Sequence, residues 1–227
     1  MYQLKLQRHS SHSKLLRLLK HAPILSRILE VGIANGYIGK NLSQCNFEII
    51  GIEKDKDSAG EAAEYYRKIF ILDLDKEDLP RLEPFDFIIL FDILEHLYEP
   101  DRTLKKVLYF LKDNGQVIIS IPNIANWAIR LRLLFGNFNY SDKGILDRSH
   151  LRFFTLKTAR QFIQEANLKI IHSDFTSIPF QFLVKPGWLS NCINEFYYLL
   201  VRLYPKLFAY QFIFVAINPR PVGYGRI

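Results

Sequence analysis

The nine residues ILEVGIANG, from Ile28 to Gly36, decide the fold of this chain. An apolar run carries a single acid, Glu30, and ends in a turn with Gly32, Ala34 and Gly36 at alternate positions. Such a run is typical of a buried strand, and glycines directly after it allow a tight turn and the close approach of another molecule. The stretch therefore predicts the first strand–turn–helix unit of an α/β sheet, with a ligand at the turn.

Similar apolar runs alternate with helix-like stretches along the rest of the chain. Helical crossovers return the chain to the same edge of the sheet, so the strands that they join are parallel. We expect an α/β fold, a three-layer Rossmann-like sheet of seven strands with helices on both faces, five or six strands parallel and the last antiparallel. The predicted strands are 27–31, 47–52, 68–72, 85–91, 115–121, 168–174 and 210–217, and the predicted helices are 36–44, 57–66, 100–112, 124–135, 154–168 (with Thr155 as N-cap) and 188–207.

Composition and length are those of a globular protein with an ample core, because 49% of the 227 residues are hydrophobic. The two cysteines, Cys45 and Cys192, are far apart and form no CxxC pair, which argues against a zinc knuckle or a disulfide framework. We therefore expect a cytoplasmic protein. Neither a secretory signal nor a membrane-spanning run of about 18 apolar residues is found.

Charge is distributed unevenly along the chain. Residues 51–100 hold 6 Lys/Arg against 14 Asp/Glu, whereas 101–160 hold 11 against 4 and the first 30 residues hold 6 against 1. Basic segments of this kind indicate an anionic partner, or else they are simply solvated faces.

Acidic residues stand at the end of each of the first four predicted strands. They are Glu30, Glu53, Asp73 and Asp92. In open α/β sheets, ligands bind at the carboxyl ends of the strands. Glu53 follows Gly32 by 21 positions, the spacing at which an acid binds the hydroxyls of a ribose. The pattern predicts a ligand that contains adenosine.

Two residues favour S-adenosylmethionine over a dinucleotide as this ligand. Tyr37 stands where a dinucleotide-binding turn would have its third glycine. The carboxylate of Glu30 would repel a pyrophosphate but suits a ligand that carries an ammonium and a sulfonium group. A nicotinamide-dependent oxidoreductase is thereby disfavoured.

At these motifs the chain resembles the class I S-adenosylmethionine-dependent methyltransferases, over roughly residues 27–175. DILEHL and SIPN are most similar to the group of ubiquinone-biosynthesis O-methyltransferases and bacterial methyltransferases of unassigned substrate, and ILDRSHLRFFT (145–155) resembles the latter. The stretches that resemble the family's five motifs, in order, are ILEVGIANG, GIEKD (51–55), LDLD (72–75), FDFIILFDILEHLYEP (85–100) and LKDNGQVIISIPN (111–123).

The resemblance implies S-adenosyl-L-methionine as cofactor and assigns roles to residues in the motifs. Glu53 would bind the ribose, Asp73 would face the adenine amino group, and Leu74 would offer its backbone N–H to the ring. The expected donor-binding residues are Glu30, Gly32, Ala34, Asn35, Gly36, Glu53, Lys54, Asp73, Leu74, Asp92 and Ile93.

Transfer to a hydroxyl needs a base, and the candidate catalytic residues are His150 and His96. His150 follows a loop, 136–149, that could close over the site, or it only ties this loop to the sheet. In the ubiquinone-biosynthesis O-methyltransferases the group matching Asp92, Glu95 and His96 is associated with a divalent metal. Many relatives use it to shape the donor pocket instead, and we expect no metal.

The acceptor is expected to be a small or lipid-linked anionic molecule, such as a glycan intermediate or a quinone-like precursor. Arginines among aromatics in 122–150 favour it. Nucleic acid is disfavoured, because the Asn/Asp-Pro-Pro-aromatic turn of amine methylation and a suitably placed cysteine are missing. The alternative is a non-catalytic module that only binds S-adenosylmethionine.

The organisation expected for 1–227 is a single methyltransferase domain, as a monomer or homodimer. Residues 1–26 would form a helical lid, and 122–150 and 175–209 would be insertions on the acceptor side. Segments 1–20 and 188–207 are basic or aromatic and either pack on the sheet or contact the inner face of a membrane peripherally.

Overall fold

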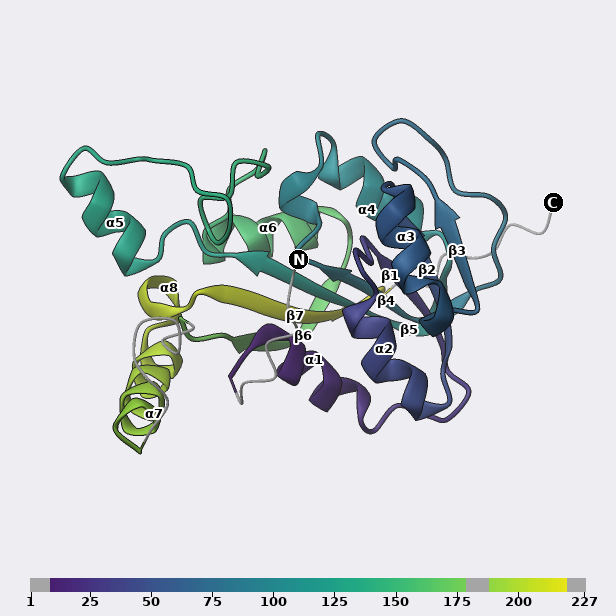
Figure 1. Ribbon diagram of the computed structural model, residues 1–227, viewed down its shortest axis with the longest axis horizontal. Helices are drawn as coiled ribbons and strands as arrows, with labels where there is room; N and C mark the ends of the chain where they lie inside the picture. Colours follow the sequence, from purple (N-terminus) through teal and green to yellow (C-terminus); the bar gives the residue numbers. More distant parts are fainter. Residues whose placement is uncertain (1–8, 179–187, 220–227) are drawn as a thin grey trace.

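The computed structural model describes residues 9–178 and 188–219, and its centre is one seven-stranded sheet (Figure 1). The strand order is β3-β2-β1-β4-β5-β7-β6. β7 is antiparallel to both of its neighbours, so the other six strands share one direction, which confirms the predicted fold class. The strands are β1 (Arg27–Val31), β2 (Glu48–Glu53), β3 (Lys68–Ile71), β4 (Phe85–Phe91), β5 (Leu111–Pro122), β6 (Lys169–Phe175) and β7 (Gln211–Ile217).

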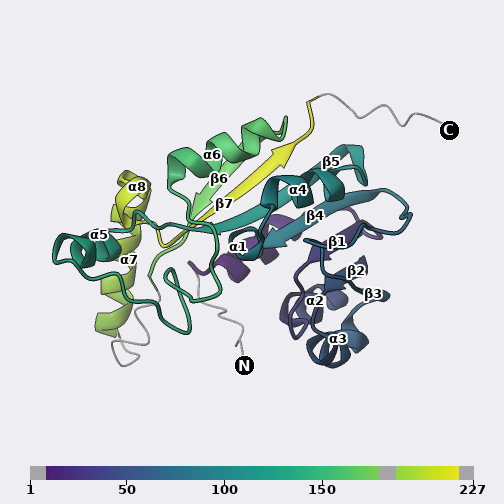
Figure 2. The ribbon, with the colours of Figure 1, turned by 90° about the horizontal axis from the view of Figure 1, so that it is seen from above.

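Helices cover both faces of the sheet, as Figure 2 shows from above. They are α1 (Ser11–Leu19), α2 (Tyr37–Leu42), α3 (Lys56–Ala62), α4 (Pro100–Leu108), α5 (Trp127–Leu134), α6 (Leu156–Glu165), α7 (Trp188–Leu203) and α8 (Pro205–Phe208), with short 3-10 turns η1 (Ser43–Cys45), η2 (Ala63–Tyr65) and η3 (Leu94–His96). Among the helices of the described segments, none has the length and apolar character needed to cross a bilayer.

The core is divided by the sheet into two layers. Alternate residues of β1 point to opposite faces: Ile28 packs with Leu15 and Leu42 from α1 and α2, whereas Leu29 packs in the layer that holds Leu104 of α4 and Ile163 of α6. All six side chains are at most 1% exposed, and burial of each contributes about 1.5–3 kcal/mol. This packing holds the strand ends, and therefore the loops after them, at fixed positions along one edge.

Two predicted helices have different boundaries in the structure. The helix predicted at 100–112 ends at Leu108, because Leu111 already pairs with Phe85 of β4 as the first residue of β5. The helix predicted at 188–207 is broken into α7 and α8 at Tyr204, which precedes Pro205. Proline disfavours helical backbone in the residue before it and has no N–H to continue the helix. By contrast, the Thr155 side chain caps α6 as predicted.

The two insertions expected on the acceptor side meet at one end of the molecule (Figures 1 and 2). Trp127 Nε1 at the start of α5 donates a 2.9 Å hydrogen bond to the hydroxyl of Tyr197 in α7. The side-chain amides of Asn123 and Asn126 each donate a 2.9 Å hydrogen bond to the carbonyl of Ala209. Residues 179–187 of the insertion predicted at 175–209 lie outside the described residues.

α1, from the predicted lid, packs against the sheet beside α2. Leu15 and Leu19 are buried in the core, and the Lys14 ammonium lies 2.6 Å from a carboxylate oxygen of Asp174 in β6. The ring of His12 meets that of Tyr37, the first residue of α2, edge to face with centroids 4.9 Å apart. The described part of the lid thus lies against the helix that follows the glycine turn, while residues 1–8 lie outside the described residues.

Candidate functional site

The glycine turn after β1 is in contact with the turn after β4. Gly32 has φ +75°, and a Cβ atom at this position would lie only 2.7 Å from Cδ1 of Ile93. Gly36 has φ +71° and Ala34 has φ +46°, both in the left-handed region. The backbone of this turn is therefore fixed in a conformation that glycine adopts easily, and the Ile93 side chain packs directly on the backbone of Gly32.

Glu53, at the end of β2, is bound to the same turn through backbone N–H groups. Its Oε2 accepts a 2.8 Å hydrogen bond from the amide of Ala34. Its Oε1 accepts from the amides of Lys54 at 2.9 Å and Asp55 at 3.0 Å. A carboxylate has about four acceptor positions, so the oriented group can still accept from a ribose hydroxyl. The structure thus brings together the predicted residues Gly32, Ala34, Glu53, Lys54 and Ile93.

Glu30 lies in β1 and is buried. Its hydrogen-bond partner, Tyr66, was not predicted from the sequence. The hydroxyl of Tyr66 donates a 2.8 Å hydrogen bond to Glu30 Oε2 and accepts a 3.2 Å bond from the amide of Gly39. Burial raises the pKa of Glu30 to about 8, although the Tyr66 hydrogen bond lowers it in part. At neutral pH the carboxyl group is therefore mostly protonated in the free protein.

The ring of Tyr66 fits this position because glycines surround it. A Cβ atom at Gly39 would lie 2.5 Å from the Tyr66 hydroxyl oxygen, and one at Gly51 would lie 3.1 Å from its ring. Gly36 is similarly close to the ring, at 3.2 Å. Two glycines outside the turn motif, Gly39 and Gly51, were thus the sequence signal for Tyr66. The reason that these positions need a small residue is visible only when the position of the Tyr66 ring is known.

The remaining donor-site acids lie in the loops after β3 and β4. Asp73 Oδ2 lies 2.8 Å from the Lys76 ammonium, and this hydrogen bond lowers the pKa of Asp73. The backbone amide of Tyr98 donates a 3.1 Å bond to Asp75 Oδ1, which joins the loop after β3 to the loop after η3. Leu74 between them is 5% exposed. Asn35 is hydrogen bonded to Glu61 near the C-terminal end of α3.

Asp92 turns away from the Glu95–His96 pair. Its φ is +53°, and its Oδ1 accepts hydrogen bonds of 2.7 Å from Ser120 Oγ and 2.8 Å from Gln211 Nε2. The side chain is therefore bound to β5 and β7. These hydrogen bonds separate Asp92 from Glu95 and His96, the two residues with which it was considered as a metal ligand.

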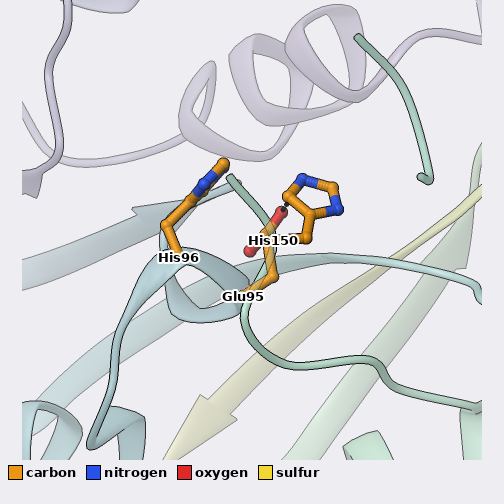
Figure 3. Close-up of side chains that lie close together, drawn as sticks. All are labelled: Glu95, His96 and His150. Atoms are coloured by element: carbon orange, nitrogen blue, oxygen red, sulfur yellow. Dashed lines mark ion pairs between the residues drawn. The ribbon is translucent and has the colours of Figure 1, made fainter. Parts of the chain in front are cut away.

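Glu95 and His96 are joined instead by His150, which arrives on the loop after α5 (Figure 3). The carboxyl of Glu95 is 1% exposed, and its Oε1 lies 4.0 Å from His150 Nε2. The rings of His96 and His150 meet edge to face with centroids 4.7 Å apart. The backbone amides of Leu151 and Arg152 donate to the carbonyl of Glu95 at 2.8 and 3.0 Å, so the loop is fixed beside η3.

Hydrogen bonds to carbonyl groups determine the tautomers of both histidines. His150 Nδ1 lies 3.0 Å from the carbonyl oxygen of Ile145, and His96 Nδ1 lies 3.2 Å from that of Ser149. A carbonyl only accepts, so both Nδ1 atoms carry hydrogen and a lone pair remains on each Nε2. The bond to Ile145 was not foreseen, and it leaves His150 Nε2 facing Glu95 as a possible proton acceptor.

Burial controls the protonation of this cluster. It raises the pKa of Glu95 well above its ordinary value, and the nearby charge of Asp92 adds to the effect. Neither oxygen of the Glu95 carboxyl has a hydrogen-bond partner among the residues that the structure describes. Burial also lowers the pKa of His96, with a smaller effect from His150. Burial therefore favours the uncharged forms of the Glu95 carboxyl and the His96 imidazole, and together with His150 the same donor set would suit a divalent metal.

A row of aromatic rings begins beside His150 and continues along the loop after α5. Phe153 lies 6.4 Å from the His150 ring and 6.1 Å from that of Phe138, and Phe138 lies 5.5 Å from Tyr140. Of the arginines in this region, Arg148 pairs with Asp142 at 3.2 Å and Arg130 donates to the carbonyl of Ala125 at 2.7 Å. The loop after α5 therefore provides an apolar and partly basic surface next to His150, the candidate base.

Comparison with known proteins identifies the family of this chain. A family profile described as a methyltransferase domain matches residues 2–173. The ubiquinone biosynthesis O-methyltransferase of Rickettsia prowazekii (strain Madrid E) is 24% identical over 183 residues, which are 78% of this chain and 71% of that protein. The mitochondrial ubiquinone biosynthesis O-methyltransferase of Candida albicans is 29% identical over 106 residues, which are 42% of this chain and only 32% of that protein.

Solved structures share the fold over nearly the whole chain. The magnesium protoporphyrin IX methyltransferase of Synechocystis PCC 6803, with bound SAH, has a TM-score of 0.62 and 14% identity, covering 92% of this chain and 82% of that one. A SAM-dependent methyltransferase of Archaeoglobus fulgidus has a TM-score of 0.63 and 16% identity, covering 91% and 92%. At these identities the likeness extends to the fold alone.

Proposed function

We propose, on the premise that this chain belongs to the S-adenosylmethionine-dependent methyltransferases, that it methylates a hydroxyl group of a small or lipid-linked anionic acceptor. A glycan intermediate or a quinone-like precursor would be such an acceptor. The observation that carries the proposal is the orientation of His150. Its Nδ1–H is bound to the Ile145 carbonyl, and its Nε2 lone pair remains available for a proton. The alternative is a module that binds the donor without turnover.

The residues at the carboxyl edge fit S-adenosylmethionine. The turn at Gly32 has no room for a side chain and exposes backbone, and Glu53 is held by three backbone amides in an orientation suited to a ribose. In our assignment Asp73 and Leu74 bind the adenine, Asn35 and Gly36 complete the turn, and Asp92 and Ile93 lie against the donor's other end. When bound, the donor supplies a methyl group attached to a positively charged sulfur.

The chain's own residues would align the acceptor and remove its proton. His150 Nε2 would accept the hydroxyl proton as the oxygen bonds to the donor's methyl carbon and the bond from that carbon to sulfur breaks, which would leave an uncharged thioether. The Ile145 carbonyl then stabilises the imidazolium through the Nδ1–H bond, as a hydrogen bond to a charged donor is stronger than one to a neutral donor. His96, whose Nε2 is also unprotonated, is the second candidate base. Loss of the Glu95 proton would place a carboxylate 4.0 Å from the charged ring.

The surroundings of His150 support an acceptor with both an apolar and an anionic part. Phe138, Tyr140 and Phe153 offer ring faces near the base. We assign acceptor binding to the insertions 122–150 and 175–209, and closure over the donor to the lid 1–26. Because the relatives from Rickettsia and Candida are named for ubiquinone biosynthesis, quinone-like precursors are the first compounds to try. We assign the reaction to the cytoplasm or to the inner face of a membrane.

The function is tested by incubating the purified protein with S-adenosylmethionine and a panel of acceptors that contain hydroxyl groups. The panel includes catechols, phenolic acids and sugar phosphates with and without a lipid chain. Mass spectrometry would detect a product 14 Da heavier, an increment that follows from replacing hydrogen by methyl, and calorimetry would measure donor binding. Donor binding without a product from any acceptor would favour the non-catalytic module, and absence of donor binding would refute the site.

A further inference from the structure

We propose that the end of the molecule formed by residues 127–140 and 188–204, here called the α5–α7 end, docks onto the surface of an anionic lipid bilayer. This end stands apart from the sheet in both ribbon views (Figures 1 and 2). The proposal is independent of which acceptor is methylated and also of whether methyl transfer occurs. It commits to lipid as the partner because of three features of this end: exposed apolar side chains, basic charge and its position next to His150.

Large apolar side chains are exposed here to an extent that the helices on the sheet do not show. Leu134 is 78% exposed, Phe135 72%, Trp188 77%, Phe196 65% and Leu203 71%. In α6, which packs on the sheet, the apolar residues Leu156, Ala159 and Ile163 are at most 4% exposed. Exposed apolar side chains on two helices that are hydrogen bonded to each other indicate a surface for contact with another molecule.

The charges of this end suit an anionic surface. Between Asp113 and Asp142 the sequence has no acidic residue, whereas Arg130 and Arg132 are both exposed. In α7 the exposed Arg202 accompanies a single acid, Glu195, which is paired with His9 at 3.0 Å. Basic and aromatic residues on one surface are typical of proteins that lie on anionic membranes.

A second copy of the chain suits this surface less well than lipid does. A two-fold dimer through this end would bring the same patch from both copies together, and so would enclose the exposed arginines of both copies in one interface. Insertion across the bilayer is also disfavoured, because α7 has 16 residues and buries Tyr197 and Val201 inside the protein. A spanning helix needs about 20 apolar residues, so α7 would lie along the membrane rather than cross it.

The two helices of this end form one surface that is connected to the candidate active site. The 2.9 Å hydrogen bond from Trp127 Nε1 to the Tyr197 hydroxyl joins α5 to α7, and Tyr197 in turn donates to the carbonyl of Phe208 at 2.8 Å. The chain continues from α5 through Phe138 to His150. Docking would therefore bring the acceptor side to the bilayer, where a lipid-linked acceptor enters without leaving the membrane.

The experiment is vesicle sedimentation with the full chain, without donor or acceptor, so that its result does not depend on the proposed function. Vesicles of phosphatidylcholine with about 30 mol% phosphatidylglycerol are compared with phosphatidylcholine alone, at low and at high salt. We expect binding to the anionic vesicles that weakens with salt. The double variants Phe135→Ser/Phe196→Ser and Arg132→Glu/Arg202→Glu should each weaken it by more than about tenfold.

Matched controls lie elsewhere on the surface. Ile24→Ser/Tyr109→Ser changes side chains that are 77% and 57% exposed, and Lys157→Glu/Arg160→Glu reverses two exposed charges on α6. Both should bind vesicles like the wild type, and circular dichroism should show that all four variants are folded. The proposal is overturned if the wild type does not bind, or if the controls lose as much binding as the patch variants. It is equally overturned if the wild type is a dimer that does not bind vesicles and the patch variants dissociate this dimer.

Discussion

The donor edge is the set of strand ends around β1 and β2 to which we assign the donor. The acceptor end is the region of α5, α7 and the loop after α5 to which we assign the acceptor. These two regions are built in different ways. At the donor edge, the positions of Gly32, Ala34 and Glu53 are determined by backbone hydrogen bonds and close backbone contact. At the acceptor end, His150 is held by a loop, and large side chains such as Phe135 remain exposed. One half of the site is therefore part of the sheet. The other half is a loop attached to the sheet, and the sequence of such a loop is free to vary with the acceptor.

The largest effect is expected from the acceptor side. His150→Gln should lower turnover by about 10²–10⁴, because it removes the lone pair that accepts the hydroxyl proton. Donor affinity measured by calorimetry should change less than twofold, since His150 belongs to the other half of the site. The control is His172→Gln, which changes an exposed histidine of β6. Equal turnover of the variant and the wild type would show that His150 only ties its loop to the sheet.

Adding a single methyl group at Gly32 distinguishes the effect of close packing on donor binding from the effect of backbone strain alone. Gly32→Ala should weaken donor binding by more than about tenfold, because the new Cβ would meet Ile93 and force the two loops apart. The matched control is Gly136→Ala, since Gly136 has a similar φ of +72° but nothing within 4 Å of a new Cβ. If both variants bind the donor equally well, the contact between the β1 and β4 loops is not part of the donor site.

Glu53 tests the ribose assignment directly. Glu53→Ala should weaken donor binding at least about tenfold, because hydrogen bonds to a charged group are worth about 1.5–3 kcal/mol. Glu64→Ala in the following turn is the control, an exposed acid in η2 with no assigned role. Calorimetry is the measurement, and unchanged affinity in Glu53→Ala would move the ribose elsewhere.

Glu30 should make folding stability depend on pH. Its folded pKa of about 8 lies above the ordinary value of 4.5, so the folded protein binds the extra proton between these values. Stability therefore falls as pH rises from about 4.5 to about 8 and is constant above, by a few kcal/mol at most. Glu30→Gln keeps an acceptor for Tyr66 and should remove this dependence. Urea unfolding at pH 5.5 and 8 checks it, and parallel curves for both proteins would contradict the raised pKa.

The smallest effect expected is that of metal removal. Dialysis against EDTA should leave turnover unchanged, because His96, His150 and Glu95 are assigned to proton transfer and Asp92 is bound to Ser120 and Gln211. Turnover would be measured again after adding Mg²⁺, Mn²⁺ or Zn²⁺. A loss on dialysis that one of these ions restores would show that the cluster holds a metal.

Local patterns in the sequence were sufficient for the donor edge and the sheet. The alternation of strands and helices predicted the parallel order, and the turn at Gly32 with the acid at Glu53 predicted the cofactor. These features involve residues that are near each other along the chain or at one edge of a regular sheet. The sequence was a poorer guide to element boundaries, as at Leu111, where pairing with Phe85 begins β5 before the predicted start at residue 115.

Contacts between distant segments could not be read in this way. Nothing near Glu30 in the sequence indicates that Tyr66 donates to it, and nothing near His150 indicates Glu95 as its neighbour. The direction of Asp92 depends on Gln211, which lies 119 positions later. Each of these contacts depends on how loops leave the sheet, and loop paths follow no periodic pattern.

The sequence by itself determined the fold, the cofactor class and the edge of the sheet at which the donor is expected. Strand periodicity and the spacing of glycines and acids are local properties, and they allow few arrangements of the backbone. Only the tertiary structure decided that Glu30 is protonated, that Nε2 of His150 is the free nitrogen and that α5 and α7 expose their apolar side chains together. The reason is that protonation and exposure depend on which segments exclude water from a group, and those segments are brought together only by folding.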